Sequence, residues 1–153
     1  MPYNPQEVLG YWCNKAAQAF RSQLDKGANT IGLKWTEALV LLMIYGKPSS
    51  LVEIAKHLEH AHPSVLRQID SLEQAGYVVR SVHPEDRRIK LVSLTDKGKL
   101  AANEVLLIAQ EIHARAVKGF DEVRVEAAIT LLRDVIINLD EAELLNSCSG
   151  DAD

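Results

Sequence analysis

The segment from Pro63 to Gly76 constrains the fold most, because it has the pattern of a short helix with a defined beginning and end. Pro63 suits the first helical position, where its missing N–H costs no hydrogen bond, and Gly76 suits the left-handed residue that ends a helix. Val65, Ile69 and Leu72 recur at helical spacing, which places them on one side. The segment is therefore predicted to be an amphipathic helix.

The opposite side of this helix has the composition of a surface that reads DNA. Its members are Ser64, Arg67, Gln68 and Ser71. Arginine and glutamine can form paired hydrogen bonds with base edges in the major groove, and serine is small enough to permit close approach. We expect Ser64, Arg67 and Gln68 to read bases, and Ser71 to contact a base or a phosphate. Pro63 leaves the N-terminus of the helix facing a phosphate, which is a favourable anion site.

A hairpin pattern follows the helix. Residues 77–82 are rich in β-branched side chains and are predicted to form a strand, residues 83–88 form a polar turn with a proline, and residues 89–94 form a returning strand. Thr95 then provides a cap for a long helix. A helix, a hairpin and a further helix in this order are the layout of a winged helix-turn-helix.

The turn of this hairpin, the wing tip, carries two arginines next to an aspartate. Arg87 or Arg88 would enter the minor groove, where narrow A·T-rich DNA concentrates negative potential. Asp86 cannot favour a phosphate, so we expect it to hold a neighbouring arginine through a charge-assisted hydrogen bond. The alternative is that the arginines only keep a loop soluble. Their position directly after a helix with a polar reading face favours the DNA contact.

Two stretches of the chain resemble the MarR family of bacterial transcription regulators. Asp86-Arg87-Arg88 followed by Leu-Thr-Asp-Lys-Gly at residues 94–98 is similar to the wing signature of that family. Residues 64–78 resemble its recognition helix and the exit from it, and the SlyA-like branch is the nearest. The resemblance implies a homodimer that binds double-stranded DNA, with a small-molecule pocket between the dimer helices and the DNA-binding lobe.

The fold class expected from these patterns is mainly α with a small β-hairpin wing. The predicted parts are an N-terminal dimerisation helix and loop (residues 1–32), a winged helix-turn-helix lobe (33–95), C-terminal dimerisation helices (96–145) and a disordered tail (146–153). In the first part, residues 5–26 have helical periodicity, and a loop with two glycines follows to residue 32. The apolar stripe of the last helix is wider than one small lobe can cover, which indicates an interface.

Shorter patterns place the remaining elements of the lobe. Leu33 to Tyr45 is apolar nearly all round and is predicted to be a buried helix. Ser50 to Glu53 is a capping-box pattern that opens a short helix through Leu58. Residues 59–61 would then be the turn of the helix-turn-helix. In a two-fold dimer, two reading helices would enter successive major grooves about 34 Å apart, so the operator should be a pseudo-palindrome.

Composition restricts the class of protein. The net charge is −4, but residues 56–99 carry +2 and residues 100–153 carry −7, so the acidity lies away from the predicted reading surface. No signal peptide and no apolar run of about 18 residues is present, so no membrane association is expected. Cys13 and Cys148 lie far apart and form no disulfide framework, which fits a reducing cytoplasm.

Three residues are candidates for regulation. The resemblance implies an effector pocket, for which Trp12 and Trp35 are the candidate lining aromatics and a small aromatic molecule the candidate ligand; the alternative is that both are core residues. Cys13 lies about where peroxide-sensing relatives carry a reactive cysteine. The paired tyrosines of those sensors are not matched, since Trp35 and Ala38 stand in that segment. No cation is adjacent to the thiol in sequence, so an inert cysteine is the alternative.

Other chemistry has little support. His57, Glu59, His60 and His62 resemble a metal cluster, but they straddle a helix end and a turn, and zinc needs four convergent ligands. No phosphate-cradling glycine loop and no nucleophile elbow is present, so neither an enzyme nor a cofactor is expected. The prediction is a sequence-specific regulator of transcription, a repressor released by a small effector. The rivals are a redox sensor that uses Cys13 and a winged-helix protein-interaction module without DNA binding.

Overall fold

The computed structural model describes residues 4–58 and 62–148. The chain divides into two compact units, one that ends at His113 and one that begins at Ala114. The predicted turn at residues 59–61 lies outside the described residues. Among the helices of the described part, none combines the length and the apolar character that crossing a membrane requires.

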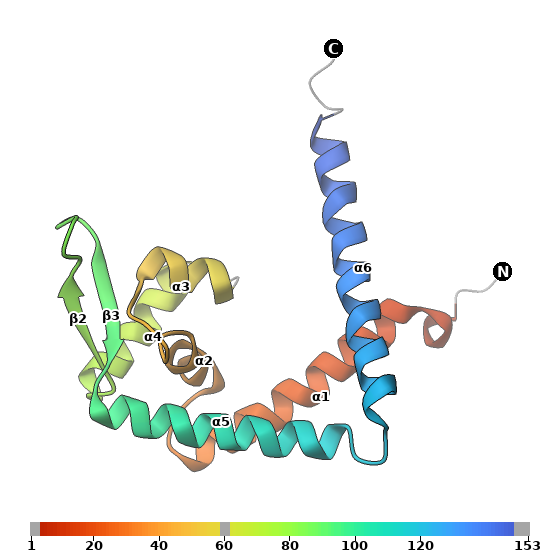
Figure 1. Ribbon diagram of the computed structural model, residues 1–153, viewed down its shortest axis with the longest axis horizontal. Coiled ribbons are helices and arrows are strands. Elements are labelled where there is room, and N and C mark those ends of the chain that lie inside the picture. Colours follow the sequence, from red (N-terminus) through yellow and green to blue (C-terminus); the bar gives the residue numbers. More distant parts are fainter. Residues whose placement is uncertain (1–3, 59–61, 149–153) are drawn as a thin grey trace. The chain divides into compact units, whose positions relative to one another are not determined.

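The elements follow one another as the sequence patterns predicted, with short additions (Figure 1). In chain order they are η1 (Pro5–Glu7), α1 (Leu9–Thr30), α2 (Trp35–Met43), β1 (Ser49–Ser50), α3 (Leu51–Leu58), α4 (His62–Gln74), β2 (Val78–Val82), β3 (Lys90–Leu94), α5 (Asp96–Ala116) and α6 (Glu122–Cys148). The fold is mainly helical with a small sheet, so the predicted fold class is confirmed.

The wing belongs to a three-stranded antiparallel sheet with strand order β1-β3-β2. β2 pairs with β3 along its whole length, from Val78 to Val82, as the predicted hairpin requires. The two-residue β1 pairs with the other edge of β3, with Ser49 opposite Val92. This strand was not predicted, because two serines have no strand pattern of their own and pair only with residues far along the chain.

The buried side of α4 forms the centre of the lobe. Val65, Ile69 and Leu72 are at most 1% exposed, and they pack in one cluster with side chains of α2, α3 and β3. Figure 1 shows α2, α3 and α4 gathered beside the hairpin of β2 and β3. The predicted apolar side of the helix is therefore confirmed, and its burial fixes which residues face outward.

The end of α4 and the start of α5 are tied together. Gly76 has a φ of +78°, and the N–H of Tyr77 donates to the carbonyl oxygen of Leu72 at 2.9 Å, which is the helix ending predicted for this glycine. Thr95 donates its hydroxyl to the carbonyl oxygen of Gly76 at 2.7 Å and accepts the N–H of Gly98 at 3.0 Å. The cap predicted at Thr95 is thus confirmed, and it anchors α5 beneath the hairpin.

Gly27 was predicted to lie in a loop, but it lies within α1. The loop predicted from residue 26 is wrong, because α1 continues to Thr30 and ends before Gly32, which has a φ of +75°. A Cβ at Gly27 would come within 2.3 Å of Cγ2 of Ile108 in α5. This glycine therefore serves a close approach of two helices rather than a turn.

The C-terminal boundary also differs from the prediction. α6 runs to Cys148, so residues 146–148 are helical rather than part of a tail, and residues 149–153 lie outside the described part. Several large apolar side chains of α6 are exposed in the single chain. They include Leu131, Leu132, Ile136, Ile137 and Leu139, which are 43–63% exposed.

Candidate nucleic-acid interface

The outward side of α4 brings the predicted reading residues together. Arg67 and Ser71 are exposed, and Ser64 and Gln68 are half-buried. All four line one shallow pocket of about 260 Å³, together with residues from the start of α2. The structure thus places these four side chains together, and their role in reading DNA stays a prediction. Pro63 lies exposed in the first turn of α4, one residue after its start at His62.

Ser71 is held by a buried carboxylate of α2. Its hydroxyl donates to Oε1 of Glu37 at 2.7 Å, and Oε2 of the same carboxylate accepts the N–H of Lys34 at 3.0 Å. Glu37 is only 8% exposed. Because a hydroxyl has one proton to donate, this geometry leaves Ser71 as an acceptor and disfavours the phosphate contact expected for it. Its direct role is to fix α4 against α2.

Gln68 is the polar side chain of this face with incomplete hydrogen bonding. Its Oε1 atom is buried and has no hydrogen-bond partner among the residues that the structure describes. A buried acceptor without a hydrogen-bond partner lowers the stability of the fold by about 1–3 kcal/mol. A hydrogen bond from a donor that enters the pocket would recover part of this free energy. The adenine amino group is such a donor in the major groove.

The two arginines of the wing tip are exposed to solvent. Asp86, Arg87 and Arg88 are all exposed. Asp86 does contact Arg88, but its Oδ1 accepts the backbone N–H at 2.9 Å. The expected bond to a guanidinium is not among the ion pairs of the described residues. The short aspartate side chain reaches the N–H two residues on more easily, which is the geometry of an Asx-turn. Asp86 therefore shapes the turn that presents the arginines.

A cation that was not among the predicted site residues joins the wing to α4. Arg80 of β2 pairs with two carboxylates, with 2.5 Å between its Nη2 and Oδ1 of Asp70 and 2.7 Å between its Nη1 and Oε2 of Glu73. Its backbone N–H also donates to Oε1 of Glu73 at 3.3 Å. This pairing offsets one of the two negative charges that Asp70 and Glu73 place on the helix predicted to approach phosphates.

A signal for Arg80 was present in the sequence. Asp70 and Glu73 lie about one helical turn apart, so their side chains share a face of α4. Alternation along β2 puts position 80 on the same face as the buried Val78. A cation at an inward strand position, close in sequence to two acids on the packed helix, predicts a pairing of this kind.

Solved structures with this arrangement include transcription regulators. Transcriptional regulator PA3341 is 28% identical with a TM-score of 0.79, and the match covers 88% of this chain and 99% of that one. A mutant of MarR from E. coli, complexed with operator DNA, is 26% identical with a TM-score of 0.75, covering 83% and 92%. The transcriptional repressor CouR, bound to a 23-mer DNA duplex, is 26% identical with a TM-score of 0.77, covering 86% and 94%.

The family model that matches the chain covers the lobe described above. Residues 31–89, from before α2 to the end of the wing turn, match the model of the MarR family. Over these residues the chain is similar to the MarR family. The resemblance based on the wing and recognition-helix motifs is thereby confirmed. Residues 64–78 and Asp86-Arg87-Arg88 lie inside the matched residues, and residues 94–98 lie beyond them.

The tryptophans proposed for a MarR-family effector pocket have different surroundings. Trp12 of α1 is 55% exposed, and its Nε1–H donates to the carbonyl oxygen of Gln6 at 2.9 Å. Trp35, the first residue of α2, is partly buried and packs against the core of the lobe. Trp35 thus has the surroundings of a core residue and Trp12 does not. A shared pocket for the two stays a prediction.

Cys13 is the predicted redox residue, and the histidines are the group that was weighed as a metal cluster and found to have little support. Cys13 of α1 is a free, half-buried thiol, so it is not a core cysteine, and its proposed redox role stays a prediction. A ring nitrogen of His57 hydrogen-bonds to the carbonyl oxygen of Glu53 at 2.9 Å. Glu59 and His60 lie outside the described residues. Within the described part, no group of three or more histidine, cysteine or acidic side chains is placed to hold a metal.

Proposed function

We propose that this chain is a dimeric regulator that binds a specific double-stranded operator, acts in the cytoplasm and represses transcription. One observation carries the proposal: the exposed Arg67 of α4 and the exposed Arg87 and Arg88 of the wing tip belong to one winged-helix lobe. The solved complexes of a mutant of E. coli MarR with operator DNA and of CouR with a DNA duplex support it, since those proteins share the fold.

Each part of the interface has a separate task in this proposal. Arg67 and Gln68 read base edges in the major groove, where arginine pairs with guanine and glutamine with adenine. Arg88 or Arg87 enters the adjacent minor groove. Pro63 leaves the free N–H groups of the first turn of α4 directed at a phosphate. Base preference is therefore expected from α4, and affinity from both elements.

Dimer formation follows from the exposed apolar side chains. The α6 residues named above and Leu9 and Phe20 of α1, which are 45% and 40% exposed, would lose contact with water against a second copy. A two-fold axis would place two α4 helices in successive major grooves, so the operator is a pseudo-palindrome. The genes that such a repressor regulates and the identity of its effector are separate questions. Release of the repressor from its operator by a small molecule stays a prediction.

The first experiment measures binding of the purified chain to the duplex upstream of its own coding sequence. Fluorescence anisotropy would compare this duplex with a scrambled one at several salt concentrations. We expect a preference of about a thousandfold or more that survives physiological salt, which is typical of specific recognition. Equal weak binding to both duplexes that vanishes with salt, repeated with other candidate operators, would instead support the protein-interaction module.

Replacing Arg67 tests the assignment of the reading surface. Arg67→Ala should weaken operator binding by about 1–3 kcal/mol and relax base preference at one position in each half-site. Lys118→Ala, which removes an exposed cation of the second unit, is the matched control and should bind like the unmodified chain. A competition assay with single-base operator variants provides the measurement. Unchanged preference in Arg67→Ala would contradict major-groove reading by this residue.

A further inference from the structure

The start of α5 holds the end of α4 through a series of hydrogen bonds. Nζ of Lys97 donates to the carbonyl oxygen of Ala75 at 2.7 Å. The hydroxyl of Thr95 donates to the carbonyl oxygen of Gly76 at 2.7 Å, and the N–H of Thr95 donates to that of Tyr77 at 3.0 Å. Three consecutive carbonyl groups after α4 thus accept hydrogen bonds from the first turn of α5 and the residue before it.

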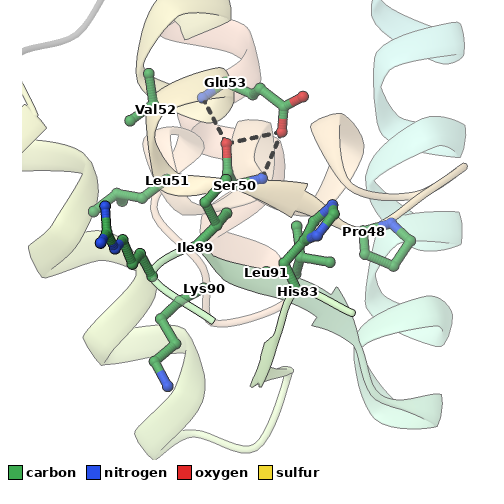
Figure 2. Close-up of a pocket in the computed structure, with 10 residues that line it drawn as sticks. Pro48, Ser50, Leu51, Val52, Glu53, His83, Ile89, Lys90 and Leu91 are labelled. Carbon is green, nitrogen blue, oxygen red and sulfur yellow. Dashed lines mark hydrogen bonds between the residues drawn. The ribbon is translucent and has the colours of Figure 1, made fainter. Parts of the chain in front are cut away.

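The end of α4 differs from a helix end that is capped locally. The terminal N–H and C=O groups of a helix need partners outside its own ladder of hydrogen bonds. At the start of α3 the partners are close in sequence, because Oε2 of Glu53 accepts the N–H and the hydroxyl of Ser50, at 2.7 and 2.8 Å (Figure 2). Ala75 instead finds its partner on another helix, 22 residues further along the chain. This contact ties the orientation of α4 to that of α5.

Lys97 brings a charge as well as a hydrogen bond to this helix end. Its side chain is exposed and makes no ion pair among the residues that the structure describes. Its Nζ lies 4.3 Å from the centre of the Tyr77 ring, within the range of a cation–π contact. A cation also interacts favourably with the partial negative charge at the C-terminal end of a helix. The carbonyl group, the ring and the helix end therefore hold the ammonium group in one place.

A small movement at this end of α4 would change the position of the reading residues. The hydrogen bond of 2.7 Å from Ser71 to Glu37 holds α4 near its middle. Ala75 and Arg67 each lie four residues from Ser71, in opposite directions, which is about 6 Å along an α-helix. A tilt of α4 about Ser71 would therefore displace Arg67 about as far as Ala75. Binding groups have to be held to within about 0.5 Å to keep their contacts.

We propose that Lys97 is a positioning residue of the recognition helix: it fixes the tilt of α4 from its end and so aligns Arg67 with the base edges. The inference rests on the proposed function for the role of Arg67, whereas the contacts of Lys97 belong to the free chain. Base contacts depend on the alignment of α4 more than the general attraction to phosphates does. Loss of the ammonium group should therefore reduce the preference for the operator.

Two substitutions in the same turn of α5 separate position from charge. Lys97→Met removes the donor and its charge, and keeps an apolar side chain over Tyr77. Lys99→Met is the matched control, because it removes the same charge two residues away, where Nζ of Lys99 pairs with Asp96 of its own helix at 3.2 Å. Both variants lose one positive charge in the first turn of α5. Lys97→Arg restores a cationic donor at the first position.

Fluorescence anisotropy with the operator and a scrambled duplex gives the main readout. We expect Lys97→Met to lower the ratio of operator affinity to scrambled-duplex affinity by about tenfold, the combined scale of a cation at a helix end and a cation–π contact. Lys99→Met should leave this ratio unchanged, and Lys97→Arg should recover most of it. Equal ratios for Lys97→Met and Lys99→Met would overturn the inference, because the position of the amine would then have no effect.

Amide NMR spectra of the free chain test the positioning role without DNA. Lys97→Met should shift the amide signals of Ser64 and Arg67, whereas Lys99→Met should leave both in place. Shifts confined to residues 75–77 would overturn the inference, since the contact would then be a local cap without influence on the reading turn. If the unmodified chain prefers neither duplex, the proposed function fails, and the NMR comparison still decides whether Lys97 positions α4.

Urea unfolding of the variants completes the test by showing that each is folded under the binding conditions. A contact that only stabilised the fold would lower the free energy of unfolding of Lys97→Met and leave its operator preference intact, and that result contradicts a positioning role. If Lys97→Met did not fold, Lys97→Gln would replace it, because glutamine is polar at this exposed position and is too short to reach the carbonyl group of Ala75.

Discussion

At the scale of single residues, Gly98 shows how tightly α5 is fitted to the hairpin. A Cβ at this position would lie 2.0 Å from the carbonyl oxygen of Tyr77, an oxygen that also accepts the N–H of Thr95. Backbone cannot move aside as a flexible side chain can. Gly98→Ala should therefore lower the free energy of unfolding by about 1–3 kcal/mol, the usual cost of overpacking.

Urea unfolding would measure this effect, with Gly10→Ala as the matched control. Gly10 lies in α1, and nothing stands within 4 Å of a Cβ built there. Alanine at an open helical position raises stability by up to about 1 kcal/mol relative to glycine. Equal free energies of unfolding for Gly98→Ala and Gly10→Ala would show that the backbone at Tyr77 can shift away from α5 without loss of stability.

Glu53 gives a pH-dependent prediction at the same scale. Hydrogen bonds from the backbone and the hydroxyl of Ser50 lower the pKa of Glu53 from its ordinary value of 4.5. A carboxyl group whose folded-state pKa is lowered stabilises the fold above its ordinary pKa, and this contribution is lost as the pH falls through the folded value. Below about pH 4.5 the chain should therefore lose stability faster than a variant without this charge.

Glu53→Gln supplies that variant, because glutamine keeps an acceptor for the N–H of Ser50 and removes only the titration. Unfolding by urea at a series of pH values from about 7 to about 3 would compare the two proteins. The stability difference should be largest near neutral pH and shrink in acid. Parallel pH profiles for the two chains would show that the capping carboxylate does not contribute to the acid sensitivity.

At the scale of elements, Arg80 couples the wing to the recognition helix α4. Arg80→Gln removes both ion pairs and leaves Asp70 and Glu73 as unpaired negative charges on a helix that is proposed to approach DNA. We expect weaker operator binding, by about tenfold, which corresponds to about 1.4 kcal/mol. Base preference should be retained because Arg67 is unchanged.

A combined variant separates the two reasons for that loss. Adding Asp70→Asn and Glu73→Gln to Arg80→Gln removes the repelling charges without restoring the ion pairs. If repulsion dominates, this variant regains most of the operator affinity in the anisotropy assay. If positioning of the wing dominates, the affinity stays low, and only Arg80→Lys, which keeps one ion pair, restores part of it.

Local patterns predicted α4 and the wing, while contacts between distant segments escaped prediction. The apolar spacing of α4, the glycine at its end and the cap at Thr95 are each set by neighbours in sequence, and all were confirmed. β1 depends on β3, and Gly27 depends on Ile108, so neither had a local signal. In the candidate site, Arg67 was predicted by its helix face, whereas the bond from Ser71 to Glu37 required the packing of α4 on α2.

At the scale of the whole molecule, the exposed apolar face of α6 predicts that the functional species is a dimer. Ile136, which is 58% exposed, should become buried on association. Ile136→Glu would place charges in the interface and shift the chain toward a monomer. Analytical ultracentrifugation measures the mass, and the anisotropy assay should show loss of the preference for a two-half-site operator over a single half-site.

Arg133→Glu offers a control on the same helix, because Arg133 is an exposed, charged position already. The mass of Arg133→Glu measured by ultracentrifugation should be closer to that of the unmodified chain than the mass of Ile136→Glu is. If Ile136→Glu remains a dimer, the dimer interface does not include this face of α6. A monomer that still prefers the full operator would contradict the proposed two-fold recognition.

The buried carboxylate of Glu37 has a consequence for the speed of recognition. Because it holds the start of α2 and Ser71 of α4 at once, α4 cannot rotate about its own axis without breaking a hydrogen bond to a buried charge. The lobe should therefore meet DNA as a preformed body, and little ordering entropy remains to be lost on contact. Association would then be governed by diffusion and orientation, and differences between operators should appear mainly in how long the complex lasts.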